Sequence, residues 1–147
     1  MKIIISPQGF KGSVSAMNAA KAIERGVKIA APDAETVLVP VADGGDGTLD
    51  ALIDCTGGQV FKSIVTGPLG RHLEANWGVM GDGQTAVIEM ALASGLALVP
   101  SNSRDPRITT TRGTGEIIKE ALDQGFNRII VGLGGSATND AGAGMAG

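Results

Sequence analysis

A strand, a glycine-rich loop and the start of a helix follow one another in the stretch RIIVGLGGSATND, residues 128–140. The β-branched run at 128–132 is typical of a buried parallel strand. Successive glycines after such a strand let backbone N–H groups surround an anion, and the hydroxyls of Ser136 and Thr138 add donors. The stretch therefore predicts an α/β fold with a phosphate-binding loop, while a small-residue turn packed closely on the sheet is the alternative interpretation.

Two named nucleotide motifs can be compared with this loop. The pattern G-x-x-x-x-G-K-[ST] occurs nowhere in the sequence, which excludes a P-loop. Residues 132–137 do match a loose G-x-G-x-x-[GA], so a domain that binds NAD or FAD stays open. The acidic residue that would support it is expected about 20 residues further on, beyond residue 147.

The rest of the sequence predicts alternating strands and helices, followed by a meander. The first strand–helix–strand unit favours parallel pairing, and turn sequences separate three central strands. The fold class is thus α/β, a Rossmann-like parallel or mixed sheet with helices on both faces plus an antiparallel meander. Strands are predicted at 2–6, 36–41, 59–66, 73–79, 85–90 and 128–132, and helices at 16–28, 49–54, 91–97 and 114–124.

Three sequence segments are expected to form the structural parts of the chain. A βαβα unit with two ligand loops spans 1–58, the meander spans 59–90, and an αβ unit with the glycine-rich loop spans 91–147. The last segment is interrupted by a polar loop at 100–110.

Composition excludes several classes of partner. The 147 residues are 43% hydrophobic and 18% charged with a net charge of −3, so a basic surface for nucleic acid or anionic lipid is not expected. A single cysteine, Cys55, excludes an intrachain disulfide and fits a reducing compartment. No apolar run approaches the roughly 20 residues of a membrane span. We therefore expect a soluble, cytoplasmic protein.

Acidic residues follow the second predicted strand. Asp43 and Asp46 flank two glycines at the position where loops after parallel strands build ligand sites. Such a carboxylate pair can hold Mg²⁺ together with substrate phosphates. An Asp–Gly turn before a helix is the alternative interpretation.

Cationic and proton-accepting candidates lie in other loops. Lys11, in the first glycine-bearing loop, could neutralise a transferring phosphoryl group. Arg112 and Arg71 are candidates for binding a substrate carboxylate, with Arg112 favoured because it stands at a helix start. Asp140 could hold metal or accept a hydroxyl proton, or it could simply cap a helix.

Five motifs resemble the bacterial glycerate kinase family, and they occur in the family's order. They are PQGFKGSVSA at 7–16, PVADGGDGT at 40–48, VTGPLG at 65–70, TTRGTGE at 110–116 and GGSATND at 134–140. The resemblance implies transfer of the ATP γ-phosphoryl group to D-glycerate with Mg²⁺, giving 2-phosphoglycerate. It also implies a two-domain α/β kinase, of which this chain is similar to the N-terminal part.

The combined hypothesis assigns each candidate a role. The nucleotide phosphates are bound by Gly134, Gly135, Ser136 and Thr138. Lys11 contacts the transferring group, and Asp43 and Asp46 hold the metal. Asp140 acts as metal ligand or base, and Arg112 or Arg71 binds glycerate. Two positions depart from the family pattern: Gln8–Gly9 replaces Asp–Ser, which removes a carboxylate, and Asp46 replaces Glu, which keeps the charge. A truncated, non-catalytic fragment is a further alternative. The partner could be a second copy of the chain or the rest of the same enzyme.

Overall fold

The computed structural model describes residues 1–10 and 13–147, which form two compact units, Met1–Ala42 and Asp43–Gly147. Helix α2 (Thr48–Thr56) belongs to the second unit, whereas the sequence-based division groups it with the first two strands. The physical reason is that Leu49 and Ile53 of this helix pack against Val87 of the second unit.

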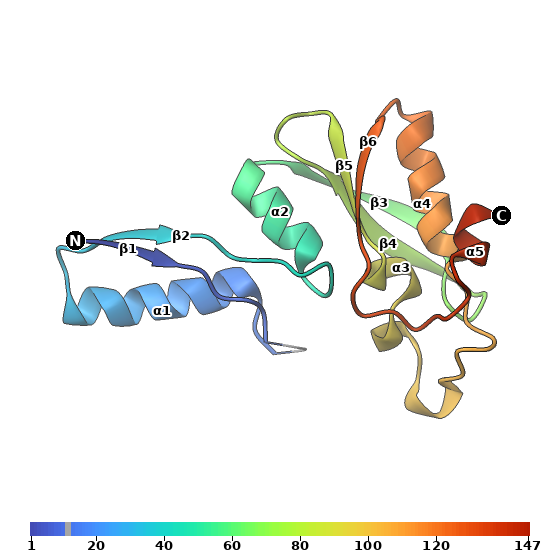
Figure 1. Ribbon diagram of the computed structural model, residues 1–147, viewed down its shortest axis with the longest axis horizontal. Helices are drawn as coiled ribbons and strands as arrows, with labels where there is room; N and C mark the ends of the chain where they lie inside the picture. The colour runs from blue at the N-terminus through green and yellow to red at the C-terminus, as the bar shows by residue number, and fades with distance from the viewer. Residues whose placement is uncertain (11–12) are drawn as a thin grey trace. The chain divides into compact units, whose positions relative to one another are not determined.

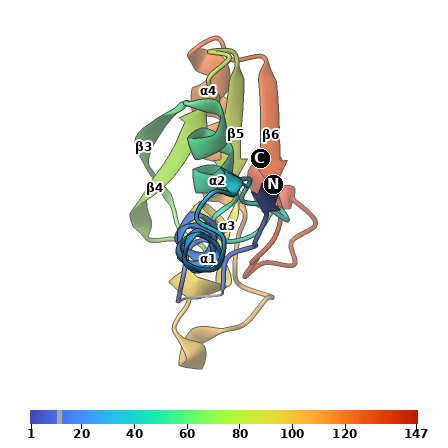
Figure 2. The ribbon, with the colours of Figure 1, turned by 90° about the vertical axis from the view of Figure 1, so that its left-hand side faces the viewer.

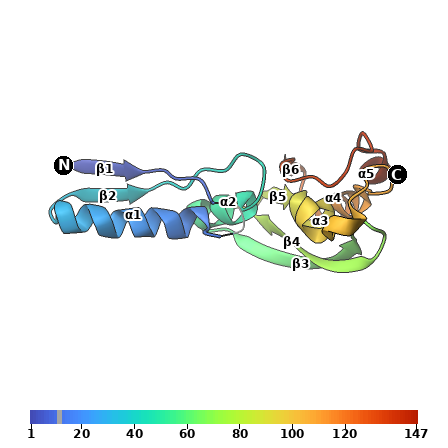
Figure 3. The ribbon, with the colours of Figure 1, turned by 90° about the horizontal axis from the view of Figure 1, so that it is seen from below.

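The first unit is a βαβ unit of β1 (Lys2–Ile5), α1 (Ala16–Ala30) and β2 (Glu35–Leu38). The strands pair in parallel with Ile4 opposite Val37, and α1 lies along both of them (Figures 1 and 3). Ser15 is the N-cap of α1, and its side chain accepts a hydrogen bond from the Asn18 N–H. The two-stranded sheet is separate from that of the second unit.

The second unit contains a four-stranded sheet in the order β3-β4-β5-β6 (Figure 2). The strands are β3 (Gln59–Thr66), β4 (His72–Val79), β5 (Thr85–Glu89) and β6 (Arg128–Gly132). β3, β4 and β5 form the predicted antiparallel meander, and β6 pairs with β5 in parallel. The prediction of a mixed α/β sheet with a meander is therefore confirmed.

Helices cover both faces of this sheet. Helix α2 (Thr48–Thr56) packs on Val87, while α4 (Arg112–Asp123) packs through Ile117 in the cluster that contains Ala86 and Ile88. Because successive side chains of a strand point to opposite faces, α2 and α4 lie on opposite sides of β5 (Figures 1 and 2).

All four predicted helices differ in their bounds. Helix α1 ends at Ala30 rather than residue 28, and α2 spans Thr48–Thr56 rather than 49–54. The helix predicted at 91–97 ends early as α3 (Ala91–Ser94), because Gly95 is extended and the next turn, η1 (Leu96–Leu98), is a 3₁₀ helix. Helix α4 begins at Arg112 rather than residue 114. A second 3₁₀ turn, η2 (Ser101–Ser103), lies in the polar loop, and a short helix, α5 (Ala143–Ala146), ends the chain.

Within residues 1–10 and 13–147, no helix combines the length and the apolar character that a membrane crossing requires.

Candidate functional site

The pairing of β5 with β6 brings two glycine-rich loops together. Glu89, the last residue of β5, lies opposite Gly132, the last residue of β6, so the loop at 133–140 starts at this edge of the sheet. The loop at 43–47 leads into α2, which packs on β5. The N–H of Gly134 donates a hydrogen bond of 2.7 Å to the carbonyl oxygen of Gly44. The two loops are therefore in direct backbone contact.

Glycine is required where the loops touch. A Cβ atom at Gly134 would lie 2.4 Å from the Gly45 Cα, and one at Gly132 would lie 2.7 Å from the Gly44 carbonyl oxygen. Both neighbours are backbone atoms, which no change of rotamer can move away. The alternative interpretation of small residues in close packing thus holds for Gly132 and Gly134.

The middle of the glycine-rich loop exposes polar groups. The Ala137 N–H donates to the Ser94 carbonyl and the Thr138 N–H to the Ser136 Oγ. Neither Gly135 nor Ser136 donates its N–H to any of the described residues. Both are exposed, and Gly135 has a φ of 73°. The Oγ of Ser136 lies 2.9 Å from the Oγ1 of Thr138, so these donors form one group that suits an anion.

The loop at 43–47, called the acidic loop below, lies against this group of hydrogen-bond donors. The Asp43 Oδ1 accepts a hydrogen bond of 2.9 Å from the Gly45 N–H. A Cβ atom at Gly135 would lie 3.0 Å from the Asp46 Oδ1, which places the Asp46 carboxylate beside the glycine-rich loop. Both aspartates are exposed.

The donor set of this loop suits Mg²⁺. The ion prefers oxygen ligands and usually binds through one or two carboxylates, phosphate oxygens and water. Among the residues that the structure describes, no group of three or more His, Cys, Asp or Glu could hold a metal. Asp43 and Asp46 are carboxylates of the kind that Mg²⁺ uses together with phosphate oxygens and water.

A buried carboxylate that was not predicted supports the acidic loop. Glu89 is 2% exposed, and its oxygens accept hydrogen bonds from the N–H groups of Gly47 (3.2 Å) and Leu49 (2.9 Å). Burial raises the pKa of the Glu89 carboxyl, and the two hydrogen bonds offset only part of that rise. The sequence feature that could have indicated this role is the single acidic residue at the end of the largely apolar strand β5.

Asp140 is surrounded by donors. Its carboxylate accepts hydrogen bonds from the N–H groups of Thr111, Gly142 and Gly144 and from the Thr111 hydroxyl. Burial acts to raise the pKa of Asp140, but these hydrogen bonds outweigh it and lower the pKa below its usual value. Asp140 therefore joins the end of the glycine-rich loop to the start of α4.

The structure brings the motifs at 65–70 and 110–116 together around Arg112. The exposed Arg112 donates its Nε–H to Glu116 at 3.0 Å, and Glu116 accepts from the N–H and hydroxyl of Thr66. Arg71 lies in the turn between β3 and β4, where its carbonyl accepts from the Gly67 N–H. Its side chain makes no ion pair with the described residues. Lys11 lies outside the described residues.

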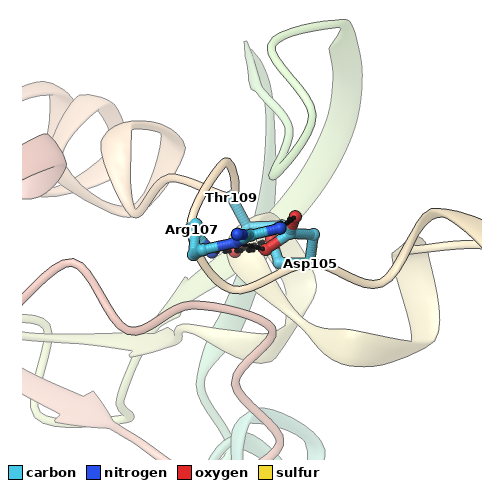
Figure 4. A network of polar contacts seen from close by, with 3 residues as sticks. All are labelled: Asp105, Arg107 and Thr109. Carbon is cyan, nitrogen blue, oxygen red and sulfur yellow. Dashed lines mark hydrogen bonds and ion pairs between the residues drawn. The ribbon is translucent and has the colours of Figure 1, made fainter.

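The polar loop before α4 also contacts the glycine-rich loop. Arg107 faces Asp105 in a two-pronged ion pair, with Nη2 2.7 Å from Oδ2, and Thr109 lies next to them (Figure 4). The Thr109 hydroxyl donates to the Ala137 carbonyl at 2.7 Å. The guanidinium of Arg107 is thus paired with Asp105, as that of Arg112 is with Glu116.

A pocket of about 430 Å³ lies at the opposite edge of the sheet. Gln84, Phe126 and Arg128 are among its lining residues, and Arg128 is the first residue of β6. Since the glycine-rich loop follows the last residue of that strand, this pocket is separate from the paired loops.

Ala141, beside Asp140, has a left-handed backbone. Its φ is 52°, a conformation that costs a side-chain-bearing residue about 1 kcal/mol relative to glycine. We expect Ala141→Gly to raise the free energy of unfolding by about 1 kcal/mol in chemical denaturation. The control is Ala143→Gly in α5, where ordinary helical backbone makes glycine unfavourable. Destabilisation by both substitutions would contradict the strain at Ala141.

Comparisons with known proteins agree on one family. A sequence model of the glycerate kinase family matches residues 3–147. The chain is 61% identical over 145 residues to a glycerate kinase of Bacillus subtilis (strain 168) and 58% identical to a glycerate 2-kinase of Escherichia coli (strain K12). Each alignment covers 99% of this chain and 38% of the relative.

A solved structure supports the same assignment. It comes from Salmonella typhimurium LT2, is provisionally named glycerate kinase 2, and superposes with a TM-score of 0.85 at 52% identity. The match covers 99% of this chain and 39% of that one. The chain therefore spans little more than a third of the length of these relatives.

Proposed function

Because the chain belongs to the glycerate kinase family, we propose that the complete protein transfers the γ-phosphoryl group of ATP to D-glycerate, giving 2-phosphoglycerate. One observation carries the proposal beyond the family. The N–H groups of Gly135 and Ser136, which none of the described residues accepts, lie beside two hydroxyls and next to the Asp46 carboxylate. Such a set of donors beside a carboxylate suits the binding of a phosphate group together with its metal ion.

Phosphoryl transfer depends mainly on positioning and on neutralising charge. In the proposed site, the N–H groups of Gly135 and Ser136 and the hydroxyls of Ser136 and Thr138 bind the nucleotide phosphates. Gly134 shapes the loop, since its own N–H is bonded to Gly44. When bound by Asp43 and Asp46, Mg²⁺ would supply positive charge to the phosphate oxygens. Lys11 is proposed to contact the transferring group.

The remaining candidates are assigned to the acceptor side of the site. Arg112, which stands at the start of α4, is proposed to bind the carboxylate of glycerate, and Arg71 is the second candidate. A carboxylate with a lowered pKa and four donors is a weak proton acceptor. We therefore assign Asp140 the task of holding Thr111, and through it the start of α4, in place.

The experiment replaces Asp43 by asparagine in the complete protein and follows ADP release with D-glycerate as acceptor. We expect kcat/KM to fall about 10-fold, because asparagine keeps one oxygen ligand but removes a charge from the metal site. The matched control is Asp54→Asn on the exposed surface of α2, which should leave turnover unchanged. Equal turnover of the Asp43 variant and the wild type would remove Asp43 from the site.

A further inference from the structure

The carboxylate of Glu89 is enclosed and yet fully hydrogen-bonded to backbone. It stands between the buried residues Ile88 and Met90, and the side chain is 2% exposed. A buried carboxylate needs donors to offset its lost hydration. Both donors are N–H groups of the segment that joins the acidic loop to α2: Gly47 and Leu49. With both oxygens engaged, Glu89 has no access to a ligand in the loops.

The start of α2 explains why the acceptor comes from another strand. Helices usually begin at Ser, Thr, Asp or Asn, whose side chains accept the first free N–H groups. Here the N-cap is Gly47, with a left-handed φ of 88° that favours glycine, and the cap makes no side-chain hydrogen bond. Glu89 supplies the missing acceptor from β5, and its negative charge suits the positive end of the helix.

The same contact determines where Asp46 lies. Asp46 directly precedes Gly47, so the hydrogen bond from the Gly47 N–H to Glu89 fixes the backbone next to that carboxylate. Glu89 is also paired in register with Gly132, at the start of the glycine-rich loop. One buried side chain thus connects the acidic loop with the strand pair that carries the glycine-rich loop.

We infer that Glu89 is a positioning residue, which holds Asp46 against the glycine-rich loop through the N–H groups of Gly47 and Leu49. The inference rests on the proposed function, because it gives Asp46 a metal to bind. Glu89 itself contacts neither metal nor phosphate.

The test measures metal binding apart from turnover. Glu89→Gln keeps the size of the side chain, but it removes the charge and turns an amide N–H₂ toward one of the two N–H donors. In the complete protein with a non-hydrolysable ATP analogue, we expect the Kd for Mn²⁺, measured by electron paramagnetic resonance, to rise about 10-fold. Amide exchange at Gly47 and Leu49 should accelerate in the same variant, and the KM for D-glycerate should stay unchanged.

The control separates positioning from general stability. Ile53→Val removes one methyl group from the core between α2 and β5, which costs about 1 kcal/mol without touching the carboxylate. We expect it to lower Tm and to leave Mn²⁺ binding unchanged. Unaltered binding in the Glu89 variant, or an equal loss in both variants, would overturn the inference.

The same measurements distinguish a failure of the proposed function from a failure of the inference about Glu89. A wild-type protein that binds Mn²⁺ and the analogue but does not phosphorylate D-glycerate would refute the proposed reaction, while the binding data would still decide the role of Glu89. A wild-type protein that binds no Mn²⁺ at all would overturn both proposals.

Discussion

Replacing Gly134 by alanine is expected to separate the two glycine-rich loops. The new Cβ atom would lie 2.4 Å from the Cα and 2.6 Å from the N of Gly45, and neither backbone atom can give way alone. The hydrogen bond from Gly134 to Gly44 would be lost as the loops move apart. We expect a loss of about 3 kcal/mol in the free energy of unfolding and at least an approximately 100-fold fall in kcat/KM.

The control for this prediction is the same substitution at another glycine. Gly26 lies within α1 and does not have a left-handed φ. Apart from its chain neighbours and the adjoining helix backbone, no atom of the described residues lies within 4 Å of its ideal Cβ position. Gly26→Ala should therefore be neutral or stabilising by up to about 1 kcal/mol, with unchanged turnover. Chemical denaturation and an ADP-release assay on both variants check this contrast. Wild-type activity in the Gly134 variant would show that close contact of the loops is not needed.

Asp140→Asn is the second change with a large expected effect. The carboxylate accepts four hydrogen bonds, and asparagine would turn an N–H₂ group toward some of the same donors. We expect a loss of about 2 kcal/mol in the free energy of unfolding. Because Thr111 directly precedes Arg112, we also expect kcat/KM for D-glycerate to fall about 100-fold, mainly through KM.

The pH dependence tests the cause of the Asp140 effect. Since the pKa is lowered in the folded protein, the ionised carboxylate stabilises the fold fully above its unfolded pKa of about 3.9. This contribution disappears as the pH falls through the folded pKa. The difference in stability between wild type and variant should be constant from pH 5 to 7 and shrink below about pH 4. The control is Asp123→Asn, an exposed residue that is paired with Lys119, and an equal loss there would contradict the assignment.

Local sequence patterns predicted most elements because each depends on nearby residues. The β-branched run at 128–132 forms β6, and the strands predicted at 59–66, 73–79 and 85–90 are observed as β3, β4 and β5. The predicted bounds of α3 and α4 were wrong because contacts with residues distant in the sequence determine where these helices begin and end. The early start of α4 accompanies the hydrogen bonds of Thr111 to Asp140, and the early end of α3 accompanies the pairing of Gly95 with Ser136.

The candidate site was predicted as separate loops, and its assembly could not be predicted. Nothing local indicates that Gly44 and Gly134 meet, because this contact depends on the parallel pairing of β5 with β6, strands separated by 38 residues of loops and helices at 90–127. Glu89 escaped detection for the same reason, since its donors lie about 40 residues earlier in the chain. The roles of Asp43, Asp46, Arg112 and Arg71 stay predictions.

We propose that the loops at 43–47 and 133–140 together bind the phosphates of a nucleotide and the metal ion that they carry. The most direct test is a crystal structure of the complete protein with Mg²⁺ and a non-hydrolysable ATP analogue. Our account predicts phosphate oxygens within hydrogen-bond distance of the N–H groups of Gly135 and Ser136, and the ion on Asp43 or Asp46. Phosphates bound elsewhere, with both N–H groups facing water or protein, would contradict it.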